Sequence, residues 1–202
     1  ALDVDGVLLD SERGGAGHWS SELTARFGID PGQLSAAFFA PSWADVVTGR
    51  RPIEPVLKRA LVEMGADADV EDVLAWWFEA DYVPFEPSFD LARRVANAGH
   101  RVVLATDQEH RRAAYLRRHI GDAIPLAHIS YSAEIGYQKH DPLFFEAASE
   151  QLGITADERS SVVFVDDRIA NVETARSFGW HAIHAAGDGA WRDEVTRMFE
   201  VG

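Results

Sequence analysis

The chain has 202 residues, a length that suits one domain or one domain with an insertion, and its 47% hydrophobic residues are enough to form a core. The formal net charge of −14 argues against a nucleic acid or an acidic membrane surface as partner. The absence of cysteine excludes disulfides and thiolate metal sites. No apolar run reaches transmembrane length and no signal peptide is visible, so we expect a cytoplasmic protein.

Residues 1–13 read as a strand followed by a turn. Asp3 and Asp5 stand two positions apart, so they project from the same side of a strand, and Gly6 permits a sharp turn directly after them. Two like charges held this close repel each other unless a cation lies between them, and Mg²⁺ prefers oxygen ligands. The segment therefore indicates either a metal site or a solvated acidic turn.

Residues 14–86 predict a helical block. Apolar residues recur at helical spacing over 53–64, closed by Gly65, and residues 73–78 give a further helix. The large aromatic residues of this block can form the core of a small helical bundle or the roof of a binding site. The candidates for the roof lie near the first segments of the block and are His18, Trp19 and Trp43.

Residues 87–202 alternate between strand and helix signals. The expected strands cover 101–105, 128–132, 162–165 and 181–185, and the expected helices cover 89–98, 108–119, 142–152 and 170–178. Ser88 and Asp141 are the expected caps of the first and third of these helices, and Gly153 the expected stop of the third. This alternation predicts an α/β fold with a Rossmann-like parallel sheet covered by helices on both faces.

Polar side chains follow several of the expected strand ends, and in a parallel sheet those ends meet at one crevice. They are Asp3, Asp5, Thr106, Asp166 and Asp167, with Lys139 in a loop. One carboxylate can attack phosphorus, and a second can protonate the leaving oxygen and then deprotonate water. A hydroxyl and an ammonium can hold phosphate oxygens, and Mg²⁺ can neutralise the charge. The set suits phosphoryl transfer.

Each of these residues also has an ordinary interpretation. Thr106 alone is a common strand-end residue, and Lys139 alone is a solvated loop lysine. Asn171 can be a buried helix residue, or it can orient Asp167. Asp166 and Asp167 have the stronger case, because two acids directly after an apolar strand need a counter-charge.

In order along the chain, four segments resemble the four motifs of the haloacid dehalogenase superfamily. They are DVDGVLLDS (3–11), ATD (105–107), GYQKHDP (136–142) and FVDDRIAN (164–171). The resemblance implies a haloacid dehalogenase-like core over 1–13 and 87–202, with an inserted helical cap over 14–86, as in the subfamily whose small cap follows the first motif. The acid pair with Asn171 looks more like the branch that contains sugar-phosphate phosphatases and the phosphatase domains of epoxide hydrolases.

The resemblance also implies a role for each matching residue. Asp3 matches the nucleophile and a metal ligand, and Asp5 the general acid/base, whose backbone carbonyl is also on the metal. Thr106 and Lys139 match the phosphate-binding pair. Asp167 matches the acidic metal ligand, and Asp166 the neighbouring acid that holds a metal-bound water.

The chain departs from the family pattern at His140, where proline is usual, and at Asp107, where asparagine is common. Neither departure removes a group that the chemistry needs. True dehalogenases of the superfamily lack an acid at the place of Asp5, so its presence favours phosphate over carbon–halogen chemistry.

We therefore expect a Mg²⁺-dependent phosphoric monoester hydrolase, a monomer or a homodimer, that acts on a small phosphorylated metabolite, with sugar phosphates among the candidates, through an aspartyl-phosphate. The alternatives are a phosphomutase of the same fold and a non-catalytic binding or regulatory protein.

Overall fold

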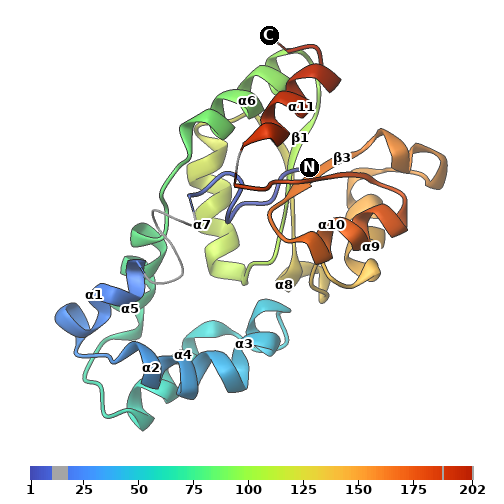
Figure 1. Cartoon of the computed structure of the whole chain (residues 1–202). Helices are drawn as coiled ribbons and strands as arrows, with labels where there is room; N and C mark the ends of the chain where they lie inside the picture. Colours follow the sequence, from blue (N-terminus) through green and yellow to red (C-terminus); the bar gives the residue numbers. More distant parts are fainter. Residues whose placement is uncertain (11–17, 188, 202) are drawn as a thin grey trace.

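The computed structural model describes residues 1–10, 18–187 and 189–201. It has an α/β core and a lobe of helices that extends away from it (Figure 1). The described part of the chain contains no helix with the length and apolarity needed to cross a membrane.

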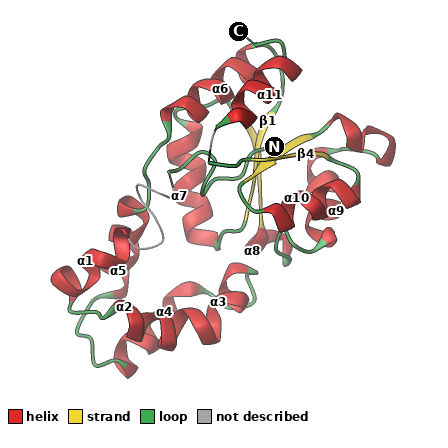
Figure 2. Cartoon of the chain, in the orientation of Figure 1, coloured by secondary structure: helices red, strands yellow, loops and turns green. Residues whose placement is uncertain are grey.

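A parallel sheet lies at the centre of the core (Figure 2). Strand β1 (Val102–Thr106) pairs with β2 (Leu126–Tyr131), and β3 (Val163–Asp166) pairs with β4 (His181–His184). The N-terminal segment joins the two pairs, because Leu2 forms parallel bridges with both Leu104 and Val165. The first segment of the chain is thus a short central strand, and Asp3 emerges at the middle of the carboxyl edge.

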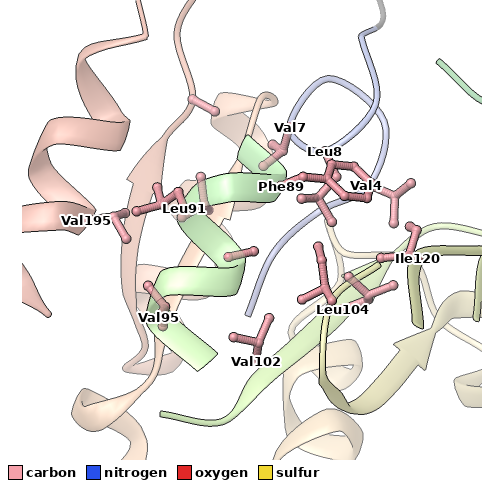
Figure 3. Packing of buried hydrophobic residues seen from close by; sticks show 14 of the residues in the cluster. Val4, Val7, Leu8, Phe89, Leu91, Val95, Val102, Leu104, Ile120 and Val195 are labelled. Carbon is pink, nitrogen blue, oxygen red and sulfur yellow. The ribbon is translucent and has the colours of Figure 1, made fainter. Parts of the chain in front are cut away.

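Alternate residues of the strands enter two separate hydrophobic clusters, one on each face of the sheet. Leu104, for example, packs in the cluster of α6 (Glu86–Asn97), α7 (His110–Gly121) and α11 (Ala190–Met198), part of which is drawn in Figure 3. Its neighbours Val103 and Ala105 pack instead with α9 (Pro142–Leu152) and α10 (Ile169–Phe178). Burial on both faces explains why these strands are continuous apolar runs, and it confirms the predicted fold class.

The predicted helix caps have two different outcomes. Asp141 caps α9 as expected, since its side chain accepts a hydrogen bond from the N–H of Leu143, and Gly153 ends the helix in the left-handed conformation. The prediction for Ser88 is wrong. Helix α6 begins earlier, with Phe85 at the N-cap, and Ser88 lies buried inside the first turn. The proline at position 87 explains the early start, because proline is well suited to the first turn of a helix.

The helical lobe has a hydrophobic cluster of its own. Its elements are α1 (His18–Phe27), α2 (Pro31–Leu34), the π-helix η1 (Ser35–Phe39), α3 (Ala40–Val47), α4 (Ile53–Glu63) and α5 (Val70–Ala80). The two helices predicted over 53–64 and 73–78 correspond to α4 and α5. The remaining short elements, in the core, are α8 (Ser132–Ile135) and the 3₁₀-helix η2 (Ala156–Ser161).

Polar contacts hold the helical lobe against the core. The Ser132 hydroxyl at the start of α8 donates to the carbonyl oxygen of Val47 at 2.6 Å. Arg111 of α7 forms ion pairs with Glu54 of α4 at 3.0 Å and Glu71 of α5 at 2.6 Å. These contacts fix the position of the lobe over the carboxyl edge of the sheet.

Candidate active site

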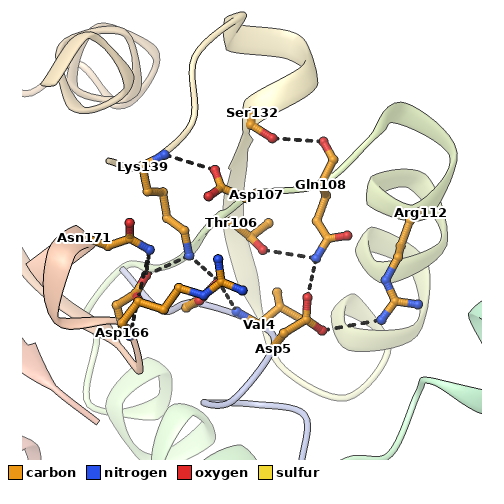
Figure 4. Close-up of polar contacts among 12 residues, drawn as sticks. Val4, Asp5, Thr106, Asp107, Gln108, Arg112, Ser132, Lys139, Asp166 and Asn171 are labelled. Atoms are coloured by element: carbon orange, nitrogen blue, oxygen red, sulfur yellow. Dashed lines mark hydrogen bonds and ion pairs between the residues drawn. The ribbon is translucent and has the colours of Figure 1, made fainter. Parts of the chain in front are cut away.

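The polar residues singled out in the sequence converge at the carboxyl edge of the sheet (Figure 4). A cavity of about 520 Å³ opens there between the core and the helical lobe. Its lining includes Asp3, Asp5, Thr106, Lys139 and Asp167. Segments that are more than a hundred residues apart in the sequence therefore supply one site, as the parallel topology requires.

Lys139 is buried at the centre of this site rather than solvated. Its Nζ lies 2.6 Å from Oδ1 of Asp3 and 2.7 Å from Oδ2 of Asp166. Burial by itself would lower the pKa of the ammonium, but Asp3 and Asp166, helped by Asp107, raise that pKa above its usual value. Lys139 is therefore a permanent cation between two carboxylates.

Asp3 is also buried, with 5% of its surface exposed. Burial raises the pKa of its carboxyl well above the usual value, although the ammonium of Lys139 opposes the shift. The backbone N–H of Val4 donates to Oδ1 of Asp3 at 2.8 Å and fixes the side chain. One carboxylate is thus held rigidly at the cavity wall, where it can meet an electrophile.

Asp166 accepts three further hydrogen bonds, from two donor groups, besides its contact with Lys139. The amide Nδ2 of Asn171 donates to its two oxygens at 3.1 and 3.2 Å, and the N–H of Arg168 donates to Oδ1 at 2.8 Å. The expectation that Asn171 orients Asp167 is therefore corrected. Asn171 lies in the first turn of α10, so its amide faces back to the end of β3. There it meets the buried side chain of Asp166 rather than that of Asp167.

Asp3, Asp166 and Asp167 form a cluster that could hold a metal ion, since one oxygen of each lies within 4.8 Å of the others. All three ligands are hard oxygens, the kind that Mg²⁺ prefers. Burial raises the pKa of the Asp167 carboxyl, and the neighbouring Asp166 adds to the shift, although Lys139 and Arg168 oppose it. The donor set therefore fits a divalent cation.

Asp5 lies at the mouth of the cavity, with its side chain about half exposed. Gln108 Nε2 donates to its Oδ2 at 2.7 Å, and Arg112 Nη2 lies 3.4 Å from its Oδ1. Arg112 also forms an ion pair with Asp81, just past α5, at 2.7 Å. Sequence reasoning missed Gln108 and Arg112. The signal for Gln108 was its place two residues beyond Thr106 at the same strand end.

Thr106 and Asp107 both face this site from the end of β1. The Thr106 hydroxyl lines the cavity and accepts a hydrogen bond from Gln108 Nε2 at 3.4 Å. Asp107 accepts the backbone N–H of Lys139 at 3.0 Å, and burial raises the pKa of its carboxyl. Asp107 thus anchors the loop that carries Lys139.

The three cap candidates have different outcomes. Trp43 lines the cavity, together with Phe39 and Trp77 from the same lobe. His18 and Trp19 begin α1, but their side chains lie outside the described part of the chain. Phe39 and Trp77 were not among the candidates, since helical spacing alone does not show which aromatic residues of a small bundle face outward.

A family model described as haloacid dehalogenase-like hydrolase matches residues 1–179. No curated protein matches the chain in sequence.

Three solved structures are similar in fold. A protein from Porphyromonas gingivalis, described as a predicted HAD-like family hydrolase, has a TM-score of 0.72 at 18% identity, and the match covers 98% of this chain and 95% of that chain. A HAD family enzyme from Bacteroides thetaiotaomicron, in complex with magnesium and inorganic phosphate, has a TM-score of 0.69 at 18% identity over 91% of both chains. An L-2-haloacid dehalogenase has a TM-score of 0.63 at 16% identity, and the match covers 91% of this chain and 81% of that chain.

Proposed function

The chain belongs to the family of haloacid dehalogenase-like hydrolases, and we propose that within this family it is a Mg²⁺-dependent phosphatase of a small phosphorylated metabolite. The observation that carries the proposal is Asp5, a second carboxyl that lines the same cavity as Asp3 and is held there by Gln108. Hydrolysis of a phosphate ester needs an acid for the leaving oxygen, which displacement of a halide does not.

The proposed reaction has two steps. In the first, a carboxylate oxygen of Asp3 attacks phosphorus, the ester P–O bond breaks, and Asp5 gives its proton to the leaving oxygen. In the second, Asp5 takes a proton from water, the water oxygen attacks phosphorus, and the bond to Asp3 breaks. The products are the free alcohol, inorganic phosphate and the original carboxylate of Asp3.

Lys139 and Thr106 would bind the phosphate oxygens, because an ammonium and a hydroxyl at the cavity wall match the charge and the donors that such oxygens need. Asp3, Asp167 and the backbone carbonyl of Asp5 would hold Mg²⁺, with Asp166 beside them. When bound, the cation supplies neutralisation of the negative charges on nucleophile and substrate. Asn171 positions Asp166 and acts only through it.

We also propose a division of the chain into a catalytic core, residues 1–13 and 87–202, and a cap, residues 14–86. All the proposed catalytic residues lie in the core, whereas Trp43 approaches the cavity from the cap. The cap would exclude water and select the substrate.

A phosphomutase is the second candidate on this fold, since a bound intermediate could be rephosphorylated by Asp3. Both reactions would use the buried Asp3–Lys139 pair in the same way, so the geometry does not distinguish them. Analysis of the products does. A sugar 1-phosphate yields free phosphate with a phosphatase and an isomeric phosphate with a mutase.

The direct test is phosphate release from a panel of phosphorylated metabolites, with Mg²⁺ present, by the parent and by Asp3→Asn. The amide keeps the size of the side chain but not its nucleophilicity, so activity should fall by at least about a thousandfold. Asp90→Asn, which changes an exposed acid of α6, is the matched control. Activity of Asp3→Asn within tenfold of the parent would rule out the assignment.

A further inference from the structure

The wall of the cavity that the helical lobe contributes is mostly apolar. Of the nine described residues between positions 14 and 86 that line it, two carry a hydroxyl, amide or charged side chain: Ser35, and Asp81, which is paired with Arg112 of the core at 2.7 Å. Most polar groups of the cavity come from the core, where the phosphate is expected. The two halves of the cavity thus suit two different parts of a substrate.

From this division we propose, on the basis of the phosphatase function proposed above, that the group esterified to phosphate is apolar, and preferably aromatic, rather than a sugar. A sugar ring placed against this wall would lose the water bound to its hydroxyls and gain few hydrogen-bond partners in return. An aryl or alkyl group loses only ordered water there, which is favourable.

Three aromatic side chains give the wall its shape. The ring centroids of Phe39 and Trp43 lie 5.4 Å apart, those of Phe39 and Trp77 5.6 Å apart, and those of Trp43 and Trp77 6.0 Å apart. Phe38, the neighbour of Phe39 in sequence, is fully buried in the core of the lobe. Phe39 and Trp43 are only partly buried and line the cavity. Such a group of rings offers faces and edges on which a further aromatic ring can pack.

The charges of the cavity disfavour a second anionic group on the substrate. The described lining carries six carboxylates but three cations. Lys139 is already paired with Asp3, and Arg112 with Asp81. One phosphate, accompanied by a divalent cation, can be accommodated, but a carboxylate or a second phosphate would meet mainly like charge.

The test compares two primary alkyl esters, phenethyl phosphate and glucose 6-phosphate, whose leaving alcohols are similar in basicity. A difference between them therefore reports binding of the organic group rather than chemical reactivity. We expect kcat/KM to be higher for phenethyl phosphate by about tenfold or more. Methyl phosphate, which hardly reaches the lobe, serves as the reference ester.

Substitutions in the lobe test whether the preference for phenethyl phosphate arises at its aromatic wall. In Trp43→Ala, the ratio of kcat/KM for phenethyl phosphate to that for methyl phosphate should fall about tenfold, and Trp43→Phe should restore most of it. Phe27→Ala is the matched control. It also removes an aromatic ring from the lobe, where Phe27 packs on Trp76 at 5.5 Å, but outside the cavity lining, so the ratio should not change.

Calorimetric titration with phenethyl phosphonate, which cannot be hydrolysed, gives a reading that does not depend on turnover. Its affinity for the parent should exceed that of inorganic phosphate, and Trp43→Ala should remove the difference. A preference for glucose 6-phosphate, or an equal loss for all esters in Trp43→Ala, would overturn this inference and leave the phosphatase function standing. Failure to release phosphate from any of the three esters would overturn the function itself.

Discussion

Gly6 lies so close to Asp167 that any side chain at position 6 would displace the Asp167 carboxylate. A Cβ atom on Gly6 would stand 2.5 Å from Oδ2 of Asp167, and the backbone at Gly6 has φ +80°. The backbone of the turn after the first strand thus packs against the side chain of Asp167, the residue that follows β3. This approach brings Asp167 to within reach of a cation shared with Asp3.

Replacement of this glycine is the first prediction. In Gly6→Ala the carboxylate of Asp167 must move, and we expect kcat to fall by about a hundredfold, the usual effect of displacing a site group by about 1 Å. The free energy of unfolding should fall by about 1 kcal/mol from the positive φ alone. Gly65→Ala is the matched control, since Gly65 has φ +69° but no heavy atom within 4 Å of its Cβ position. Equal activity of the two variants would contradict the packing argument.

The second prediction concerns Gln108, the donor that holds Asp5. In Gln108→Leu the carboxyl of Asp5 loses its 2.7 Å partner and is less well aimed at the leaving oxygen. Turnover of an alkyl phosphate should fall about a hundredfold, within the range of general acid catalysis. Turnover of para-nitrophenyl phosphate should fall much less, because nitrophenolate leaves without a proton. Gln151→Leu, at an exposed position of α9, should change neither rate.

Much of this arrangement is predictable from the sequence, for physical reasons. Strands buried on both faces appear as apolar runs, and the caps at Asp141 and Gly153 follow from short-range hydrogen bonding. The contacts of Gln108 and Arg112 with Asp5 are not predictable in this way, because they join segments about a hundred residues apart. Which acid Asn171 holds also depends on the rotation of α10 relative to β3, which spacing does not reveal.

Lys139 is the subject of the third prediction. Lys139→Met keeps the length of the side chain but leaves the carboxylates of Asp3 and Asp166 buried without their cation. Without metal, the free energy of unfolding should fall by about 3 kcal/mol, and turnover should drop for every substrate, because phosphate is common to all. Lys58→Met, which changes the exposed lysine of α4, is the control. Urea unfolding with stability equal to that of the parent would contradict the buried ion-pair description.

Metal removal gives the fourth prediction. Exhaustive chelation should abolish phosphate release, and added Mg²⁺ should restore it, because the described cluster of acids offers only oxygen ligands. In Asp167→Asn the Mg²⁺ concentration for half-maximal activity should rise about tenfold, and Mg²⁺ should raise the thermal unfolding midpoint less than in the parent. Asp193→Asn, on the exposed side of α11, should behave like the parent. Full activity after chelation would exclude metal dependence.

The last prediction concerns pH and Glu109, which caps α7 from a buried position. Burial raises the pKa of its carboxyl, although the N–H groups of Arg111 and Arg112 that it accepts oppose the shift. The folded state therefore holds this proton more tightly than the unfolded state. The contribution of protonated Glu109 to the free energy of unfolding is complete below the ordinary glutamate pKa of 4.5. It is lost as the pH rises through the raised pKa of the folded state.

Glu109→Gln removes this titration and keeps an oxygen for the cap. Relative to the parent, the variant should therefore gain free energy of unfolding as the pH rises above about 4.5. Urea unfolding at a series of pH values measures the difference, with Glu173→Gln, at an exposed position of α10, as the control that should show no such trend. If the difference in free energy of unfolding between variant and parent stayed constant over these pH values, Glu109 would have the same pKa in the folded and the unfolded chain.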